Sequence, residues 1–349
     1  MKRLYKYIFS ITLMIGISLL LIYFSSKNLS QKNESVTTIS DSSFFFDTFV
    51  TITLYKDNAN INYEELLANS FKLCAKYENI FSTTLSNSEL YNLNQCDENV
   101  KLSKDFQYLL QKSTDFEVLT KGAFNVKLGA ICNLWNFKNS TIPNSQEINS
   151  CLNSVNSYDY ILTDNTFSWV GDKNIKKPLI DLGGIAKGYI ADKLKEYLTS
   201  QGVSYGIINL GGNVLLIGSK PDKSSYSIGI KYPFSDNDYI ATVNLSDYSV
   251  VTSGIYERYF EKDNKLYHHL LNPTTGYPVE NQLYSVTIIA KSSTTADALS
   301  TAVFVLGMDE GLKLVNSLED VYAVFVDSNE KITISDGLLI KNSSEISIN

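Results

Sequence analysis

A glycine-rich turn is the first stretch whose residue types are suited to binding an anion. Residues 181–188 read DLGGIAKG, between a short apolar run and a helical pattern. The start of a helix offers unpaired backbone N–H groups and a positive dipole end, and glycine lets the backbone approach a ligand. Lys187 adds a cation. The spacing is neither a P-loop nor a dinucleotide turn, so a tight turn with a solvated Lys187 stays open as the alternative.

A carboxylate and a hydroxyl group share one face of a predicted helix. Asp297 and Thr301 are four residues apart in TTADALST, and residues at this spacing are neighbours on a helix surface. Together they form an all-oxygen pair suited to a hard cation such as Mg²⁺. Thr294 followed by Asp297 also matches a capping-box pattern, which would make Asp297 a helix-start residue. Both interpretations stay open.

The two histidines of the chain are adjacent, in YHHLLNPTTGYP. Turn sequences follow them directly. A histidine in a strand is usually structural, although an imidazole beside a site can act as an acid or a base. Neighbouring strand residues face opposite ways, so only one of His268 and His269 is expected to enter a site.

The context of Ser253 argues against a serine hydrolase. Ser253 lies in VTSGIYERYF, which lacks the G-x-S-x-G nucleophile elbow. Arg258 in the same stretch is a candidate for binding a phosphate or for pairing with an acidic side chain.

Helix and strand patterns alternate without a regular period, which predicts an α+β fold with one interleaved catalytic domain. Helices are predicted at 63–81, 106–119, 185–200 and 295–306, the last closed by Gly307. A loop is predicted at 139–157. Strands are predicted at 44–55, 205–210, 214–217, 226–230, 240–245, 283–290, 321–327 and 331–335.

The N-terminus has the pattern of a membrane anchor. A basic stub (1–6) precedes residues 7–24, which carry no charge and would span about 27 Å as a helix, near the hydrocarbon thickness of a bilayer. No A-x-A cleavage site follows, so an uncleaved anchor is favoured over a cleaved signal. Polar residues 25–43 are predicted to be a flexible linker, and 44–340 the catalytic domain on the extracytoplasmic side.

Composition sets further limits. The chain has 349 residues, of which 44% are hydrophobic, and this is enough for a large core. The net charge of −7, without a basic patch, argues against nucleic acid as a partner. The spacings of Cys74, Cys96, Cys132 and Cys151 match no zinc or redox motif, and we expect buried free thiols.

Several of these stretches, in the same order, resemble the ApbE family of FAD:protein FMN transferases. The matching motifs are DLGGIAKGYIAD (181–192), NLGGN (209–213), TSGIYERYF (252–260), HHLLNPTTGYP (268–278) and TTADALSTAVFVLG (294–307). Weaker matches lie at 46–55, 81–94 and 122–137. The resemblance covers nearly all of residues 44–337.

The resemblance implies roles for individual residues. It assigns metal ligation to the Gly184 carbonyl, Asp297 and Thr301, and it makes His269 the candidate catalytic base or positioning group. It places FAD contacts at Asp181, Lys187, Ala123, Phe124 and Asn125, and near Phe46, Ser82 and Leu271. This chain has Asn125 and Asn272 where the family often has Asp, and Phe46-Asp47-Thr48 where it often has M-G-T, so we expect altered contacts rather than lost activity.

The resemblance also implies an activity: Mg²⁺-dependent transfer of FMN from FAD to a Ser or Thr hydroxyl of an acceptor protein, with release of AMP. The implied acceptors are exported or membrane redox proteins. Two other functions stay open, hydrolysis of FAD to FMN and AMP, and flavin binding without chemistry. The Asp297–Thr301 pair and His269 favour an enzyme over a binding module, because binding alone requires neither.

Overall fold

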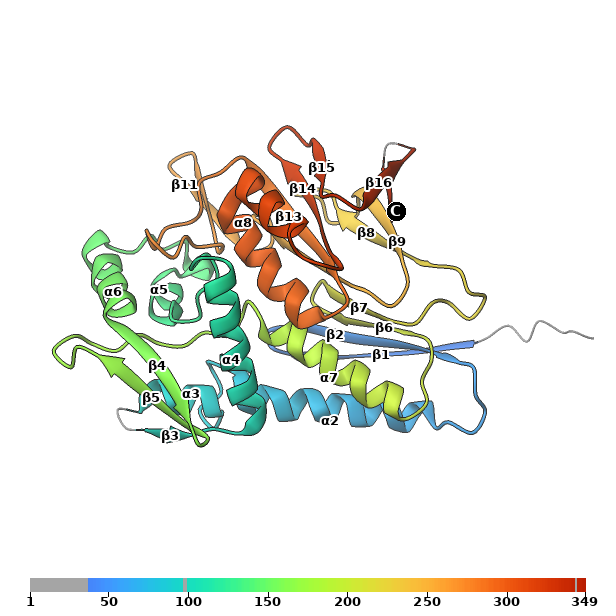
Figure 1. Ribbon diagram of the computed structural model, residues 1–349, viewed down its shortest axis with the longest axis horizontal. Helices are drawn as coiled ribbons and strands as arrows, with labels where there is room; N and C mark the ends of the chain where they lie inside the picture. Colours follow the sequence, from blue (N-terminus) through green and yellow to red (C-terminus); the bar gives the residue numbers. More distant parts are fainter. Residues whose placement is uncertain (1–36, 97–98, 343) are drawn as a thin grey trace, which may run out of the picture. The chain divides into compact units, whose positions relative to one another are not determined.

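The computed structural model describes residues 37–96, 99–342 and 344–349, and it has the mixed α+β architecture that the sequence predicts. Its largest sheet has the spatial order β1-β2-β6-β7-β10-β13-β14-β15 (Figure 1). From β2 to β15 the neighbouring strands are antiparallel. The strands are β1 (Thr37–Phe45), β2 (Thr48–Lys56), β6 (Gly206–Leu210), β7 (Asn213–Ile217), β10 (Ser249–Gly254), β13 (Leu283–Ala290), β14 (Val321–Asp327) and β15 (Ile332–Ile334).

The start of this sheet corrects two predictions. Residues 37–43, predicted as linker, belong to β1, and the predicted single strand 44–55 is a hairpin of β1 and β2. Phe46 and Asp47 form its turn with φ of 54° and 57°. Two successive left-handed residues suit the twist of a tight hairpin, but Asn-Gly or Asp-Gly is the usual signal. Phe46-Asp47 is not such a pair, so the sequence pattern did not predict the turn.

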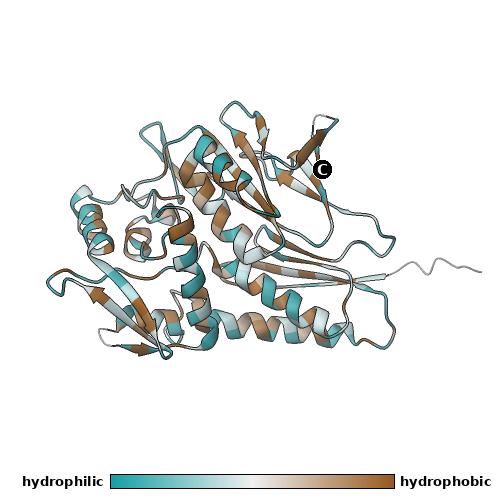
Figure 2. Ribbon diagram, viewed as in Figure 1, coloured by the Kyte–Doolittle hydropathy of each residue, from teal (hydrophilic) through white to brown (hydrophobic). Residues whose placement is uncertain are grey.

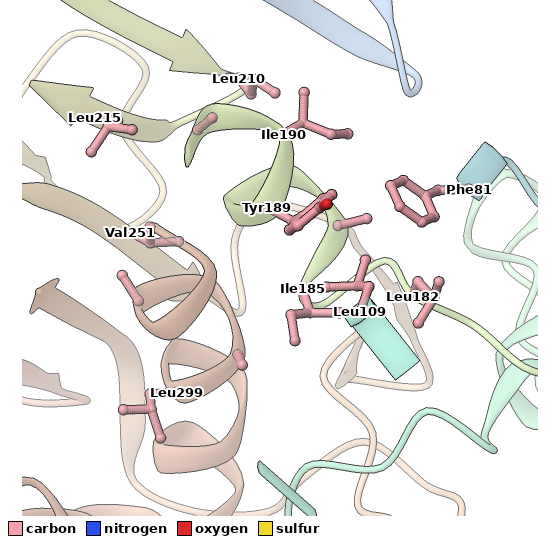
Figure 3. Close-up of a cluster of buried hydrophobic side chains, with 14 of the residues drawn as sticks. Phe81, Leu109, Leu182, Ile185, Tyr189, Ile190, Leu210, Leu215, Val251 and Leu299 are labelled. Carbon is pink, nitrogen blue, oxygen red and sulfur yellow. The ribbon is translucent and has the colours of Figure 1, made fainter. Parts of the chain in front are cut away.

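Three helices pack together and against the large sheet. They are α2 (Tyr63–Phe81), α7 (Ala186–Ser200) and α8 (Ser293–Asn316), and α7 contacts both α2 and α8 (Figure 1). Figure 3 shows Tyr189 of α7 pointing toward Phe81 of α2 in the apolar core, and their rings are 5.8 Å apart at 84°. Burial of these aromatic and aliphatic side chains holds α7 in place.

Helix α8 continues beyond the predicted end. Its first part has a nearly unbroken run of buried residues, and apolar positions are visible along much of the helix in Figure 2. Gly307 has φ 78° and ψ −179°, so it does interrupt the helix as predicted, but a second helical segment follows to Asn316. A glycine takes this backbone conformation without the steric cost that a side chain brings.

A group of shorter elements lies between β2 and α7 in the sequence. It contains α3 (Glu89–Gln95), α4 (Lys104–Leu119), α5 (Gly129–Leu134), the 3₁₀ turn η1 (Phe137–Asn139), α6 (Ser145–Ser157), β3 (Val100–Lys101), β4 (Tyr158–Thr163) and β5 (Thr166–Gly171). The three strands form a sheet in the order β3-β5-β4.

The predicted loop at 139–157 is wrong from residue 145 onward, where α6 forms. Asn144 and Glu147 make a reciprocal capping box at its start, and such a pair satisfies backbone donors that a helix end leaves unpaired. The many Asn and Ser residues of this segment favoured the prediction of a loop, but it forms a helix in which Ile148 and Val155 are buried.

The remaining strands form two smaller units. One sheet has the order β16-β17-β9-β8, with β17 parallel to β9, and β11 pairs with β12 in a separate hairpin. The strands are β8 (Tyr226–Lys231), β9 (Tyr239–Leu245), β11 (Tyr259–Lys262), β12 (Lys265–His268), β16 (Leu338–Lys341) and β17 (Glu345–Ile348). β17 lies beyond residue 340, where the sequence placed the end of the domain.

The predicted anchor at 7–24, the stub before it and residues 25–36 lie outside the described residues. Among the residues that are described, no helix is long and apolar enough to cross a bilayer. All four cysteines are free, as expected, but only Cys74 is buried, and Cys96 is exposed.

Candidate active site

The carboxylate of Asp297 lies between helices α7 and α8. Its Oδ2 accepts a hydrogen bond from the backbone N–H of Gly188 at 2.9 Å, and its Oδ1 is 3.7 Å from Nζ of Lys187. Asp297 is buried, with 3% of its surface exposed. Helix α7 has no side-chain cap of its own, so Asp297 pairs with one of the N–H groups that its first turn leaves free. The positive end of the α7 dipole also favours the charge.

Thr301 and Gly184 lie beside this carboxylate. Thr301 is one turn along α8 from Asp297. A Cβ atom built on Gly184 would stand 3.5 Å from Oγ1 of Thr301 and 3.4 Å from the ring of Phe124. The structure therefore brings together the three residues that the sequence assigned to a metal site.

The capping-box interpretation of Asp297 is wrong. The N-cap of α8 is Ser292, whose side chain accepts from the N–H of Thr295. Thr294 instead donates its hydroxyl to Asp192, at 2.6 Å.

Asp192, which the sequence analysis gave no role, connects α7 to the start of α8. Its carboxylate also accepts from Oγ of Ser292 and from the N–H groups of Ser293 and Thr294, at 2.8, 2.8 and 2.9 Å. Gly188 and Asp192 are four residues apart on α7, so both face α8. That i,i+4 spacing was the available signal. Asp192 and Asp297 together fix the position of α8 relative to the glycine-rich turn.

The turn itself is ordered by Asp181. Its Oδ1 accepts from the N–H of Gly183 at 2.7 Å, and Nζ of Lys187 donates to the Gly183 carbonyl at 3.0 Å. The Cys132 thiol is next to Asp181, and its pKa is raised by burial and by the charge of that carboxylate. A small cavity of about 40 Å³ lies here, lined in part by Asn94, Ile180 and Asp181.

The predicted FAD-contact segment 123–125 runs beside this turn. The N–H of Asp181 donates to the Val126 carbonyl at 2.8 Å. Asn125 donates its amide to Glu117 at 3.1 Å and accepts from the N–H of Lys127 at 2.8 Å. Burial raises the pKa of Glu117. An Asp at position 125 would place a second carboxylate there, which is a physical reason for Asn in this chain.

Phe46 and Ser82 meet at the C-terminal end of α2. The N–H of Phe46 donates to the Glu78 carboxylate at 2.7 Å, and the N–H of Ser82 donates to the Glu78 carbonyl at 3.0 Å. Ser82 also accepts from the N–H of Leu85. Both residues thus bond to Glu78, and within the described residues no hydrogen bond or ion pair joins them directly to Asp297 or Thr301.

The two histidines have different surroundings, although they do not share a strand as expected, because β12 ends at His268. His268 is buried, and its Nδ1 accepts from the N–H of Leu270 at 3.3 Å, so its Nε2 carries the proton and donates to the Val279 carbonyl at 3.1 Å. Both ring nitrogens are therefore engaged. Burial lowers the pKa of His268 to about 4.

His269 is partly exposed and follows the end of β12. Its Nδ1 lies 3.3 Å from the Arg258 carbonyl. A carbonyl only accepts, so Nδ1 carries the proton and Nε2 keeps a lone pair. Burial, followed by the charge of Arg258, lowers the pKa of His269 to about 3, and Lys187 contributes to the same shift. His269 is thus neutral near pH 7 and lies within electrostatic reach of the glycine-rich turn.

Leu271 anchors the loop that carries His269. It is buried and forms a bridge with Pro278. Nε1 of Trp135 donates to the Gly276 carbonyl at 2.9 Å and holds the far side of the loop. Leu271 therefore packs within this loop, and its predicted position near FAD stays a prediction.

Asp297 and its neighbours fit a Mg²⁺ ion by their chemistry. Mg²⁺ commonly takes one or two carboxylates, substrate phosphates and waters. The carboxylate of Asp297, the hydroxyl of Thr301 and the backbone of Gly184 supply oxygen only. Among the described residues there is no group of three or more His, Cys, Asp and Glu side chains arranged for a metal, and Asp297 is the one carboxylate among the three residues assigned to the ion.

Comparison with known proteins gives the family of this chain. The family model described as "ApbE family" matches residues 46–325. This chain belongs to the ApbE family. It is 36% identical over 279 residues to the FAD:protein FMN transferase of Klebsiella pneumoniae (strain 342), covering 78% of this chain and 85% of that protein. A protein of the same name from Treponema pallidum (strain Nichols) is 31% identical over 310 residues, covering 84% and 85%.

ApbE structures share the fold as well. The crystal structure of the ApbE protein from Thermotoga maritima superposes with a TM-score of 0.77 at 32% identity, covering 86% of this chain and 97% of that one. The flavin transferase ApbE from Vibrio cholerae gives a TM-score of 0.75 at 26% identity, covering 86% and 98%. The resemblance seen in the motifs is confirmed.

Proposed function

We propose that this protein is an FAD:protein FMN transferase, which splits FAD and attaches the FMN half to a hydroxyl side chain of an acceptor protein. Membership of the ApbE family and the names of its relatives support the reaction. The observation that supports a reactive site in this chain is the buried Asp297, held by Gly188 and facing Lys187 beside Thr301.

The reaction is a substitution at phosphorus. A Ser or Thr oxygen of the acceptor forms a bond to the FMN phosphorus, the bond from that phosphorus to the bridging oxygen breaks, and AMP leaves with the oxygen. The hydroxyl proton must be transferred to a base or to solvent. Catalysis of such a step depends mainly on positioning and on offsetting negative charge.

Asp297, Thr301 and the Gly184 carbonyl would hold a Mg²⁺ ion, which when bound offsets charge on the pyrophosphate and the leaving AMP. Lys187 supplies a fixed cation at the start of α7, next to backbone N–H groups suited to phosphate oxygens. The Gly183-Gly184 pair leaves room for the pyrophosphate to approach the backbone.

His269 is our candidate for taking the acceptor proton. Its neutral imidazole has Nδ1 committed to the Arg258 carbonyl, which turns the lone pair of Nε2 away from that carbonyl. Its low pKa makes it a weak base, so we assign it mainly to holding the hydroxyl in line with phosphorus and accepting the proton as the bond forms.

We also propose that residues 7–24 hold the enzyme on the membrane with its catalytic domain on the extracytoplasmic side, where exported or membrane redox proteins are its acceptors. The uncharged length of this segment and its basic flank support the proposal. N-terminal sequencing of membrane-extracted protein tests it, since a mature start near residue 25 would contradict an uncleaved anchor.

Incubation of the full-length protein with FAD, Mg²⁺ and a Ser- or Thr-containing acceptor peptide tests the activity. Mass spectrometry should find the peptide carrying FMN through a phosphoester. If the peptide is unmodified while FMN and AMP accumulate, the enzyme is a hydrolase. If FAD stays intact, the chain binds flavin without chemistry.

A further inference from the structure

Three hydroxyl groups meet where strand β10 packs against helix α8. Oγ of Ser253, on β10, lies 2.8 Å from Oγ of Ser300 and 3.4 Å from Oγ1 of Thr301, both on α8. Oγ of Ser300 also lies 2.9 Å from the carbonyl oxygen of Asp297. Ser300 is buried, and Ser253 and Thr301 are partly buried. The cluster therefore contacts the side chain of Thr301 and the backbone of Asp297, the two residues whose side chains we assign to the metal.

The direction of each hydrogen bond follows from counting protons. Each hydroxyl has one proton to donate, and a carbonyl oxygen has none. Ser300 must therefore donate to the Asp297 carbonyl, and it can only accept from Ser253. Ser253 has then used its proton, so it can only accept from Thr301. The chain runs in one direction, from Thr301 through Ser253 and Ser300 to the Asp297 backbone.

We propose that Ser253 is a positioning residue, which draws the hydroxyl proton of Thr301 toward β10 and leaves the lone pairs of Oγ1 for the cation. A hydroxyl can ligate a cation only through a lone pair, and a proton pointing at the ion would oppose binding. Oγ1 of Thr301 also adjoins the Gly184 backbone, so the lone pairs are available on the side of the glycine-rich turn. This inference rests on the proposed function only in taking Mg²⁺ as the ion at the site.

The same geometry gives Ser253 no role as a nucleophile. Its proton is committed to Ser300, and no imidazole or carboxylate contacts its Oγ within the described residues. Ser253 acts through Thr301, and its removal should weaken metal binding rather than the chemical step.

The chain offers a matched control one residue away. Oγ1 of Thr252 lies 2.8 Å from Oγ1 of Thr287 on β13, and Thr252 and Ser253 are adjacent in β10, so they face opposite sides of the sheet. Thr252→Ala removes one hydroxyl–hydroxyl contact from the same strand without touching α8. This variant shows the effect of losing one hydroxyl–hydroxyl contact within the sheet alone.

The test uses purified full-length protein and Mn²⁺ as the probe, with free Mn²⁺ followed by electron paramagnetic resonance. We expect Ser253→Ala to raise the Kd for Mn²⁺ by about 3- to 10-fold, the size of one hydrogen bond. The Kd of Thr252→Ala for Mn²⁺ should stay within about twofold of the wild-type value. Ser253→Thr keeps a hydroxyl and should have the Kd of the wild type. Thermal unfolding of each variant checks that it is folded.

A second measurement separates metal binding from chemistry. The rate of FMN transfer by Ser253→Ala should be low at limiting Mg²⁺ and should approach the wild-type rate as Mg²⁺ is raised to saturation. Equal Kd values for Ser253→Ala and wild type, or an equal loss in Thr252→Ala, would overturn the proposal. So would a wild-type protein that binds Mn²⁺ no better than Asp297→Asn. If the wild type binds Mn²⁺ in this pattern but modifies no acceptor, the transferase function fails and the role of Ser253 stands.

Discussion

The junction of α7 with α8 differs from the segment that carries the two histidines, residues 268–278 and here called the rim, in how the polar groups are paired. At the junction, Asp192 and Asp297 accept hydrogen bonds from the opposite helix, and the hydroxyl groups beside them form a directed chain. At the rim, the side chain of His269 makes one hydrogen bond to the described residues, through Nδ1, and its backbone N–H donates to the same Arg258 carbonyl. The junction therefore holds charge in a fixed place, whereas at the rim Nε2 of His269 keeps the lone pair that we propose for the acceptor hydroxyl.

The largest expected effect comes from the junction. Asp297→Asn keeps an oxygen acceptor for the Gly188 N–H but removes the only carboxylate that we assign to the metal. We expect Mg²⁺-dependent FMN transfer to fall by more than about 10³-fold, beyond the usual cost of one stabilising group, while the protein stays folded. Circular dichroism and AMP release measure the two quantities. Wild-type activity in the folded variant would rule out the metal assignment.

The second-largest expected effect is a loss in the rate of FMN transfer at the rim, and it should differ between the two histidines. His269→Ala should reduce the rate of transfer by about 10²–10⁴-fold, the range of general acid–base catalysis, and His268→Ala should cost far less once folding is allowed for. Turnover at saturating FAD and Mg²⁺ measures both. Equal losses would mean that the pair is structural, and a larger loss at His268 would reverse the assignment.

The pH profile sharpens that assignment. With a pKa of about 3, His269 stays neutral above pH 5, so the acid limb that it contributes should lie below the range in which the enzyme is usually assayed. A limb near pH 6.5 that disappears in His269→Ala would show that substrate binding restores an ordinary histidine pKa.

Asp192 should affect stability more than chemistry. Its carboxylate accepts four hydrogen bonds from the start of α8, so Asp192→Ala leaves those donors unpaired. We expect the free energy of unfolding to fall by roughly 2–4 kcal/mol, because hydrogen bonds to charged groups are among the stronger ones. Chemical denaturation measures it, with Asp192→Asn as the milder control. A loss below about 0.5 kcal/mol would show that water replaces the carboxylate.

The smallest expected effect is the pH dependence that His268 gives to stability. The pKa of His268 in the folded protein is about 4, below the ordinary value of 6.5. Between about pH 6.5 and 4 the unfolded chain therefore binds a proton at this histidine that the folded protein does not bind. The wild type should therefore lose stability relative to His268→Gln as pH falls from about 6.5 to 4, and not above that range. Denaturation midpoints at several pH values measure the difference. A constant difference would mean that His268 has an ordinary pKa when folded.

Strong local patterns in the sequence predicted many of the helices and strands. The helix at 63–81 and most strands from residue 205 onward have clear apolar periodicity, and the structure has them within a few residues. Segment 145–157 was missed because polar Asn and Ser residues outnumber its few buried positions. The Phe46-Asp47 turn was missed because neither residue is a typical hairpin signal.

The sequence motifs identified residues that lie close together, but they did not predict the hydrogen bonds between them. Gly184, Asp297 and Thr301 were identified from motifs, and they lie together. That Asp297 caps the first turn of α7, over a hundred residues earlier, depends on how two helices pack, which local pattern does not encode. The same holds for Ser253, whose partners are on a different element.

The ratio of two products shows whether this site transfers FMN to a hydroxyl, as we propose, or to water. Full-length protein would be incubated with FAD, Mg²⁺ and excess acceptor peptide, and AMP and FMN-bearing peptide would be quantified in the same samples by chromatography. We expect equal amounts of the two at every time point, with neither formed by Asp297→Asn. AMP in clear excess over modified peptide, matched by free FMN, would contradict it.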